Sequence, residues 1–128
     1  MRMMLVGTGA VGQCIVELLL KRDPEKEWFT YCLLSDINEK HAQDVFEALK
    51  DDRLQFGYVD ATQKEMVKEE IQKHNKDFVM DASSPFCANV ILMRRMNVIV
   101  IMRIWELFLS QKKNRNMEWA LKTVMNLL

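Results

Sequence analysis

The chain has 128 residues, the length of one domain and enough to bury a hydrophobic core. Basic and acidic side chains balance at 18 each, so the net charge gives no reason to expect nucleic acid or an anionic membrane as a partner. The balance is uneven, because residues 1–93 hold 11 basic and 16 acidic side chains and residues 94–128 hold 7 and 2.

The cysteines and histidines indicate neither disulfides nor a metal. Cys14, Cys32 and Cys87 are odd in number and lack a C-x-x-C spacing, which favours reduced, buried thiols in a cytoplasmic protein. His41 and His74 lie among charged residues, where we expect solvent-exposed helix surfaces, and no cluster has metal-ligand spacing. No apolar run reaches the roughly 18 residues of a membrane span, so no membrane partner is expected.

Short apolar runs alternate with amphipathic runs along the first two thirds of the chain. An apolar run at 3–6 leads through a glycine-rich turn into a helix from about 10 to 22. The next expected strands and helices alternate at 29–35, 39–50, 54–59, 62–75 and 77–80. Thr62 and Glu65 have the spacing of a capping box that would open the third helix. Ser84 followed by Pro85 would start a further helix reaching about residue 96.

This alternation is typical of βαβ units. We therefore expect an α/β fold, a Rossmann-like doubly wound parallel sheet with strand order 3-2-1-4-5 and helices on both faces. Residues 1–93 would form the dinucleotide-binding core. Residues 94–128 would add a fifth strand at 98–102 and a closing helix in a divergent, basic tail, without a separate substrate domain.

The turn Gly7-Thr8-Gly9-Ala10-Val11-Gly12 has the G-x-G-x-x-G spacing of a phosphate-binding loop. The first glycine allows a tight turn, the second lets the backbone approach a pyrophosphate, and the third lets the helix pack closely on the strand. The following helix would present free N–H groups and its positive dipole end to the phosphates. The turn is weak evidence alone and gains weight from the strand and helix that flank it.

Asp36 follows the second apolar run, 24 residues after Gly12, where the fingerprint places an acidic residue that binds the adenosine ribose. A carboxylate there would repel the 2′-phosphate of NADP, so we expect NAD as the cofactor and NADP less so. The alternative is that Asp36, or Asn38, only starts the following helix.

Two further loops follow strands at the same edge of the expected sheet, where ligands bind in doubly wound folds. Asp60 and Ala61 follow the third strand, and Asp60 could contact the adenine amine. Ala82, Ser83 and Ser84 follow the fourth strand, where a serine could contact a phosphate or ribose. The alternatives are a turn residue at Asp60 and a helix cap at Ser84.

With the turn, the acidic residue and these loops together, the chain resembles the N-terminal cofactor-binding domain of the saccharopine dehydrogenase family. Residues 5–13 (LVGTGAVGQ), 59–62 (VDAT) and 79–86 (VMDASSPF) carry the resemblance, which covers about residues 3–93. The glycine turn is shared with many Rossmann proteins, and the DASSPF loop is more specific.

The resemblance implies an oxidoreductase that transfers hydride between a nicotinamide cofactor and an imine formed from an amino acid or polyamine and a carbonyl compound. It implies that Gly7, Gly9, Gly12 and Asp36 match cofactor-binding positions. It assigns no catalytic residue, because members carry these largely on a second domain. A homospermidine synthase-like enzyme, with NAD as internal hydride carrier, is the alternative within this class.

The chain departs from the family pattern beyond residue 93. By this resemblance, the next strand would end in Tyr-x-Asp, whereas the strand expected here ends at Met102 and is followed by Arg103. Together with the shift in charge, this departure favours a truncated or diverged reading frame. The resulting protein would be inactive as an enzyme on its own. A second hypothesis is a noncatalytic interaction module, in which an exposed fifth strand and the helix around Trp119 favour self-association as a homo-oligomer.

Overall fold

A computed structural model describes residues 1–73, 75–83 and 99–103 of the chain. The described elements alternate between strands and helices as far as β4. They are β1 (Arg2–Val6), α1 (Ala10–Arg22), β2 (Tyr31–Asp36), α2 (Glu39–Leu49), β3 (Leu54–Tyr58), α3 (Lys64–Lys73), β4 (Phe78–Asp81) and β5 (Ile99–Arg103). The helices expected at 85–96 and near the C-terminus lie outside the described residues.

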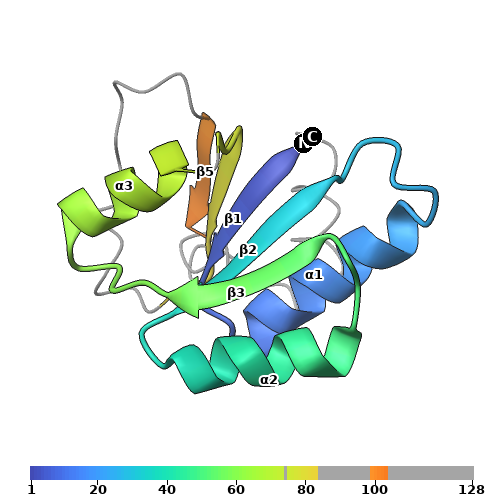
Figure 1. The fold of residues 1–128 in the computed structure, drawn as a ribbon, viewed down its shortest axis with the longest axis horizontal. Helices are drawn as coiled ribbons and strands as arrows, with labels where there is room; N and C mark the ends of the chain where they lie inside the picture. Colours follow the sequence, from blue (N-terminus) through green and yellow to red (C-terminus); the bar gives the residue numbers. More distant parts are fainter. Residues whose placement is uncertain (74, 84–98, 104–128) are drawn as a thin grey trace, which may run out of the picture.

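The strands form one parallel sheet in the order β3-β2-β1-β4-β5 (Figure 1). β1 lies in the middle, with Val6 beside Ser35 of β2 and Asp81 of β4. The order reverses between β1 and β4, and such a switch point opens a crevice at the carboxyl ends of the strands. The predicted fold class and strand order are confirmed.

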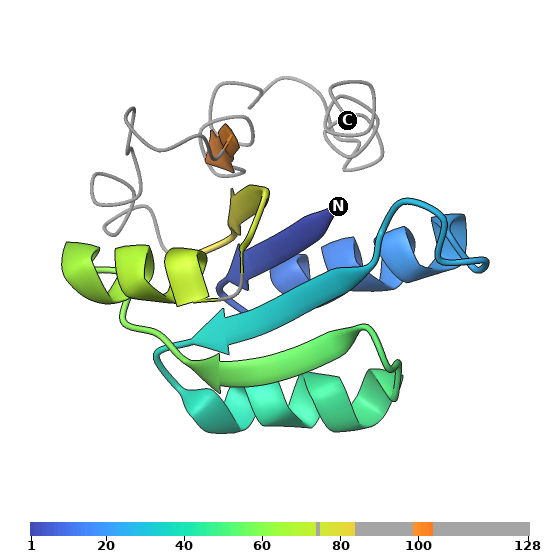
Figure 2. The same ribbon diagram turned by 45° about the horizontal axis from the view of Figure 1, so that its top comes forward.

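Alternate residues of the strands face two separate cores. Met3 and Leu5 pack with side chains of α1 and α2, whereas Met4 and Val6 pack with those of α3. Figure 2 shows α1 and α2 along one face of the sheet and α3 on the other. Because β1, β2 and β4 are buried on both faces, they consist of nearly continuous apolar residues, whereas Gln55 and Tyr58 of β3 are exposed.

The second strand begins later than predicted, at Tyr31 instead of residue 29. Phe29 is fully buried but lies in the loop between α1 and β2. The Asp23 carboxylate accepts hydrogen bonds from the backbone N–H groups of Glu27, Trp28 and Phe29 at 2.9, 3.0 and 2.6 Å. These bonds compete with strand pairing and fold the segment into a compact turn.

Helix α3 begins at Lys64, and Thr62 precedes it in a turn. The Thr62 hydroxyl donates to Oδ1 of Asp60 at 2.7 Å, and its backbone N–H donates to the same oxygen at 2.9 Å. The capping box predicted at Thr62 is therefore not where the helix begins, because the helix starts one residue later and Thr62 belongs to the turn that Asp60 organises. This turn positions Asp60 beside the carboxyl edge of the sheet.

Candidate dinucleotide site at the carboxyl edge of the sheet

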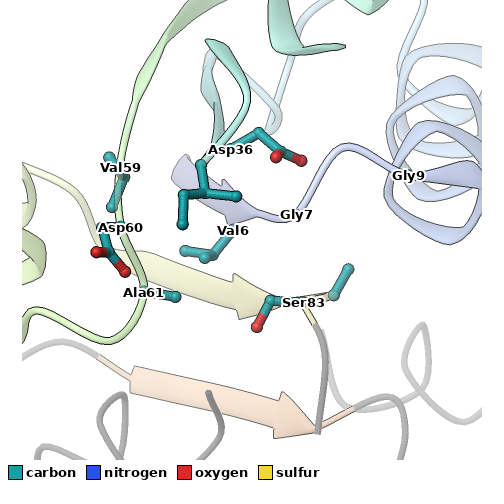
Figure 3. Close-up of a pocket in the computed structure, with 10 residues that line it drawn as sticks. Val6, Gly7, Gly9, Asp36, Val59, Asp60, Ala61 and Ser83 are labelled. Carbon is teal, nitrogen blue, oxygen red and sulfur yellow. The ribbon is translucent and has the colours of Figure 1, made fainter. Parts of the chain in front are cut away.

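A cleft of about 280 Å³ lies at the carboxyl edge of the sheet, beside the switch point between β1 and β4 (Figure 3). Its lining comes from the ends of β1, β2 and β4 and from the loop after β3. The lining residues are Val6, Gly7, Gly9, Asp36, Ile37, Val59, Asp60, Ala61, Ala82 and Ser83. The structure thus brings the glycine turn, Asp36 and the two further loops that the sequence analysis selected to one cavity.

Two glycines of the turn are required by the protein's own packing. Gly7 has φ +94°, and a Cβ there would lie 2.8 Å from backbone atoms of Ala82 and Ser83. A Cβ on Gly12 would lie 2.0 Å from the carbonyl oxygen of Gly7 and 3.2 Å from Leu5. Both positions therefore exclude a side chain. Gly7 packs against the loop after β4, and Gly12 in the first turn of α1 packs against the turn after β1.

Gly9 differs from both, because the described structure gives no steric reason for a glycine there. Its φ of −64° and ψ of −173° are open to any residue, and no described heavy atom lies within 4 Å of a Cβ built on it. A side chain at Gly9 would occupy the space over the start of α1. The glycine keeps this space open, as a phosphate bound against the backbone requires.

The start of α1 is also unusual in its electrostatics among the three described helices. Gly9 is its N-cap residue, and the described residues place no side-chain cap on it and no acidic residue in its first turn. The first turns of α2 and α3 contain Glu39 and Glu65. The first N–H groups of a helix lack intrahelical partners, and its N-terminus attracts anions. An anionic phosphate would satisfy both at α1.

Asp36 ends β2 and is tied to the glycine turn. Its Oδ2 accepts the backbone N–H of Thr8 at 2.8 Å and the Thr8 hydroxyl at 3.0 Å, and its Oδ1 accepts the N–H of Asn38 at 2.9 Å. Asn38, not Asp36, is the N-cap residue of α2, without a side-chain cap. Asp36 therefore lies before the helix, at the point where the fingerprint requires an acidic residue.

Asp36 carries a negative charge at neutral pH. Partial burial alone would raise the pKa of its carboxyl group, but the hydrogen bonds from Thr8 and Asn38, with the charge of His41, hold the pKa below its usual value. The carboxylate accepts hydrogen bonds only, so it suits the hydroxyl groups of a ribose and opposes a phosphate.

Asp60 and Asp81 organise the other two loops in the same way. The side chain of each accepts the backbone N–H and the hydroxyl of the residue two positions on, Thr62 and Ser83 respectively. Gln63 also donates to Asp60, at 3.1 Å. The interpretation of Asp60 as a turn residue is therefore compatible with its place in the cleft, since it does both.

Sequence reasoning missed Val6, Ile37 and Val59 in the lining of the cleft. Ile37 is 64% exposed directly after Asp36, and Val11 and Tyr58 are also exposed at this edge. An apolar residue directly after Asp36, in a loop where solvent contact favours polar side chains, was the signal available for Ile37. Of these three, Ile37 lines the cleft, and an exposed apolar side chain there favours a ligand with an apolar face.

The remaining predicted site residues lie elsewhere. Thr8 is buried within the turn and Gly12 is buried in α1, and neither lines the cleft. Ala10 and Val11 are exposed on the first turn of α1, and Ser84 lies outside the described residues. Within the described ranges, no group of three or more His, Cys, Asp or Glu side chains could hold a metal ion. In the same ranges, no helix is long and apolar enough to span a bilayer.

A parallel doubly wound sheet, a glycine turn at an uncapped helix start and an acidic residue ending β2 define a Rossmann-type dinucleotide-binding domain. The pattern described as the saccharopine dehydrogenase NADP binding domain matches residues 3–95. The chain belongs to this family, and the domain binds a nicotinamide dinucleotide. Comparison with curated proteins found no match.

Proposed function

We propose that this chain is the cofactor-binding part of a saccharopine dehydrogenase-like oxidoreductase and that its preferred cofactor is NAD. The observation that carries the proposal is the open space over Gly9 at the uncapped start of α1. Neither the backbone dihedral angles of residue 9 nor the packing of the described residues around it requires a glycine. A pyrophosphate held by the N–H groups of this helix start would account both for the glycine and for a first turn without an acidic residue.

The preference for NAD rests on Asp36. Its ionised carboxylate lines the cleft and would accept hydrogen bonds from the ribose hydroxyls of NAD. A 2′-phosphate in the same place would bring two negative charges together in a partly buried site. The family's description refers to NADP, and the proposed preference of this chain for NAD rests on the Asp36 carboxylate alone.

The adenine would lie between Ile37 and the loop after β3. Ile37 and Val59 supply apolar surface on two sides of the cleft, and the Asp60 carboxylate lies in the same lining. Asp60 already accepts from Thr62 and Gln63 and keeps acceptor capacity for an exocyclic amine. Ala61, Ala82 and Ser83 would complete the wall without filling the cavity.

The reaction class follows from the family resemblance. When bound, the nicotinamide cofactor would carry hydride to or from an imine derived from an amino acid. The described residues bind and orient the cofactor, and we assign none of them a catalytic role. The homospermidine synthase-like alternative would use the same site, with NAD as an internal hydride carrier.

Three further predictions from the sequence complete the proposal. We propose that residues 1–93 form the cofactor-binding core and residues 94–128 a divergent extension, and the family match at 3–95 supports the first range. Self-association through the extension rests on the fifth strand expected at 98–102 as an exposed edge and on the apolar helix expected around Trp119. A cytoplasmic location rests on the odd number of cysteines without paired spacing.

Titration with NADH, followed by cofactor fluorescence, tests the proposal. We expect saturation below about 1 mM and about tenfold weaker binding by Asp36→Ala, which loses a charge-assisted ribose contact. Asp44→Ala is the matched control, because Asp44 is exposed on α2 and pairs only distantly with Lys40, at 3.9 Å. The absence of saturation, or equal binding by Asp36→Ala and wild type, would overturn the proposal.

A further inference from the structure

Thr8 lies inside the glycine turn, where the family fingerprint accepts any residue. It is only 3% exposed, and it contacts a residue 28 positions away in the sequence. Its backbone N–H and its hydroxyl group both donate to Oδ2 of Asp36, at 2.8 and 3.0 Å. The hydroxyl therefore supplies a hydrogen bond that the turn's backbone alone would not.

These bonds fix the orientation of the Asp36 carboxylate. Oδ2 is held by Thr8 of the turn, and Oδ1 is held by the backbone N–H of Asn38, at 2.9 Å. Because two chain segments hold the two oxygens, rotation about the side-chain bonds would break contacts on both sides. A carboxylate oxygen accepts about two hydrogen bonds, so Oδ2 is filled by Thr8 and Oδ1 keeps capacity for one more donor.

We infer that Thr8 is a positioning residue that sets cofactor choice, because its hydroxyl holds the Asp36 carboxylate where a ribose 2′-hydroxyl can bind and a 2′-phosphate cannot. The inference rests on the proposed preference for NAD. A free aspartate side chain could rotate away from a 2′-phosphate and reduce the repulsion. The tie to Thr8 prevents this rotation and keeps the free acceptor site of Oδ1 available to a ligand hydroxyl.

The role requires the hydroxyl and not merely a buried side chain of this size. A valine would fill the same space with a methyl group in place of the hydroxyl and would leave the backbone N–H bond of Thr8 intact. A serine would keep the hydroxyl and lose only the methyl group. Comparison of the two variants separates orientation of Asp36 from packing of the turn.

The test compares the dissociation constants for NADH and NADPH in wild type, Thr8→Val and Thr8→Ser, using the full chain. We expect wild type to favour NADH, Thr8→Val to narrow the ratio of the two constants by about tenfold, and Thr8→Ser to keep the wild-type ratio. Thr8→Ala removes the same hydroxyl without adding volume and gives the same expectation should Thr8→Val not fold.

The outcomes distinguish the inference from the function on which it rests. A wild type that binds neither cofactor, or that favours NADPH, overturns the proposed function. A wild type that favours NADH, with an unchanged ratio in Thr8→Val or Thr8→Ala, overturns the inference about Thr8 alone. Equal loss of affinity for both cofactors, without a change in ratio, has the same meaning, because a purely structural role would weaken both alike.

Discussion

Aspartate side chains organise the loops at both edges of the sheet, but the two edges differ in what these loops do. At the amino edge, Asp23 holds the loop before β2, and Arg53 donates to the Asp23 carbonyl oxygen at 2.6 Å and to both oxygens of Asp51. At the carboxyl edge, Asp36 and Asp60 each organise a loop that borders an open cleft. One edge is closed upon itself, and the other keeps space and donors for a ligand.

This difference separates residues that stabilise the fold from residues that bind. Hydrogen bonds at the amino edge join the chain to itself, so their loss should lower stability and leave binding intact. Gly9 at the carboxyl edge should behave in the reverse way, whereas loss of Asp36 should lower both binding and stability, because its carboxylate borders the cleft and also accepts hydrogen bonds from Thr8 and Asn38. Gly7 and Gly12 are exceptions, because they lie beside the cleft but are required by packing. The following variants test this division.

Gly12→Ala should have the largest effect on the free energy of unfolding. Its Cβ would lie 2.0 Å from the backbone oxygen of Gly7, which no rotation of a side chain can relieve. We expect destabilisation by about 3 kcal/mol or more, measured by urea denaturation. A stability equal to wild type would show that the turn is not packed as the structure has it.

Asp23→Ala should come next and should act on stability alone. The change leaves the N–H groups of Glu27, Trp28 and Phe29 without their acceptor, and the N–H of Phe29 is buried. We expect the melting temperature to fall by roughly 10 °C, with NADH affinity unchanged in the folded protein. Asp52→Ala is the control, because its ion pair with Lys26 is exposed, and its melting temperature should change by less than about 3 °C. A larger fall in Asp52→Ala than in Asp23→Ala would contradict the account of this edge.

Acid should weaken the amino edge through Asp51. Hydrogen bonds from Arg53, which outweigh the opposing effect of burial, lower the pKa of the Asp51 carboxyl to about 2. A folded-state pKa below the unfolded value stabilises the protein above the unfolded pKa, and this stability is lost as pH falls through the folded one. We expect the free energy of unfolding to decrease between about pH 4 and pH 2 and to decrease less in Asp51→Asn. An identical pH dependence in the two proteins would rule out this contribution.

Much of the architecture was predictable because it depends on local patterns. Apolar runs such as 3–6 gave the strands, the glycine spacing gave the turn, and the confirmed strand order agrees with the family resemblance. The start of β2 was not predictable, since Phe29 has the composition of a strand residue and only the three bonds to Asp23 keep it in a loop.

The candidate site was predictable at residues that a ligand requires and less so at residues that support them. Gly9 and Asp36 follow from the fingerprint spacing and lie in one cleft. The tie between Thr8 and Asp36 joins residues 28 positions apart, so only the packing of β1 beside β2 brings them together. The place of Ile37 in the cleft could not be predicted, because it depends on the direction in which the chain turns after β2.

Gly9→Ala tests the central claim most directly, because it changes the space over the start of α1 and little else. The account predicts stability within about 1 kcal/mol of wild type, since a less favourable N-cap residue and a less flexible unfolded chain offset each other. It predicts NADH affinity at least about tenfold weaker, because the added methyl group occupies the space of the pyrophosphate. A stable Gly9→Ala variant that binds NADH as tightly as wild type would contradict it.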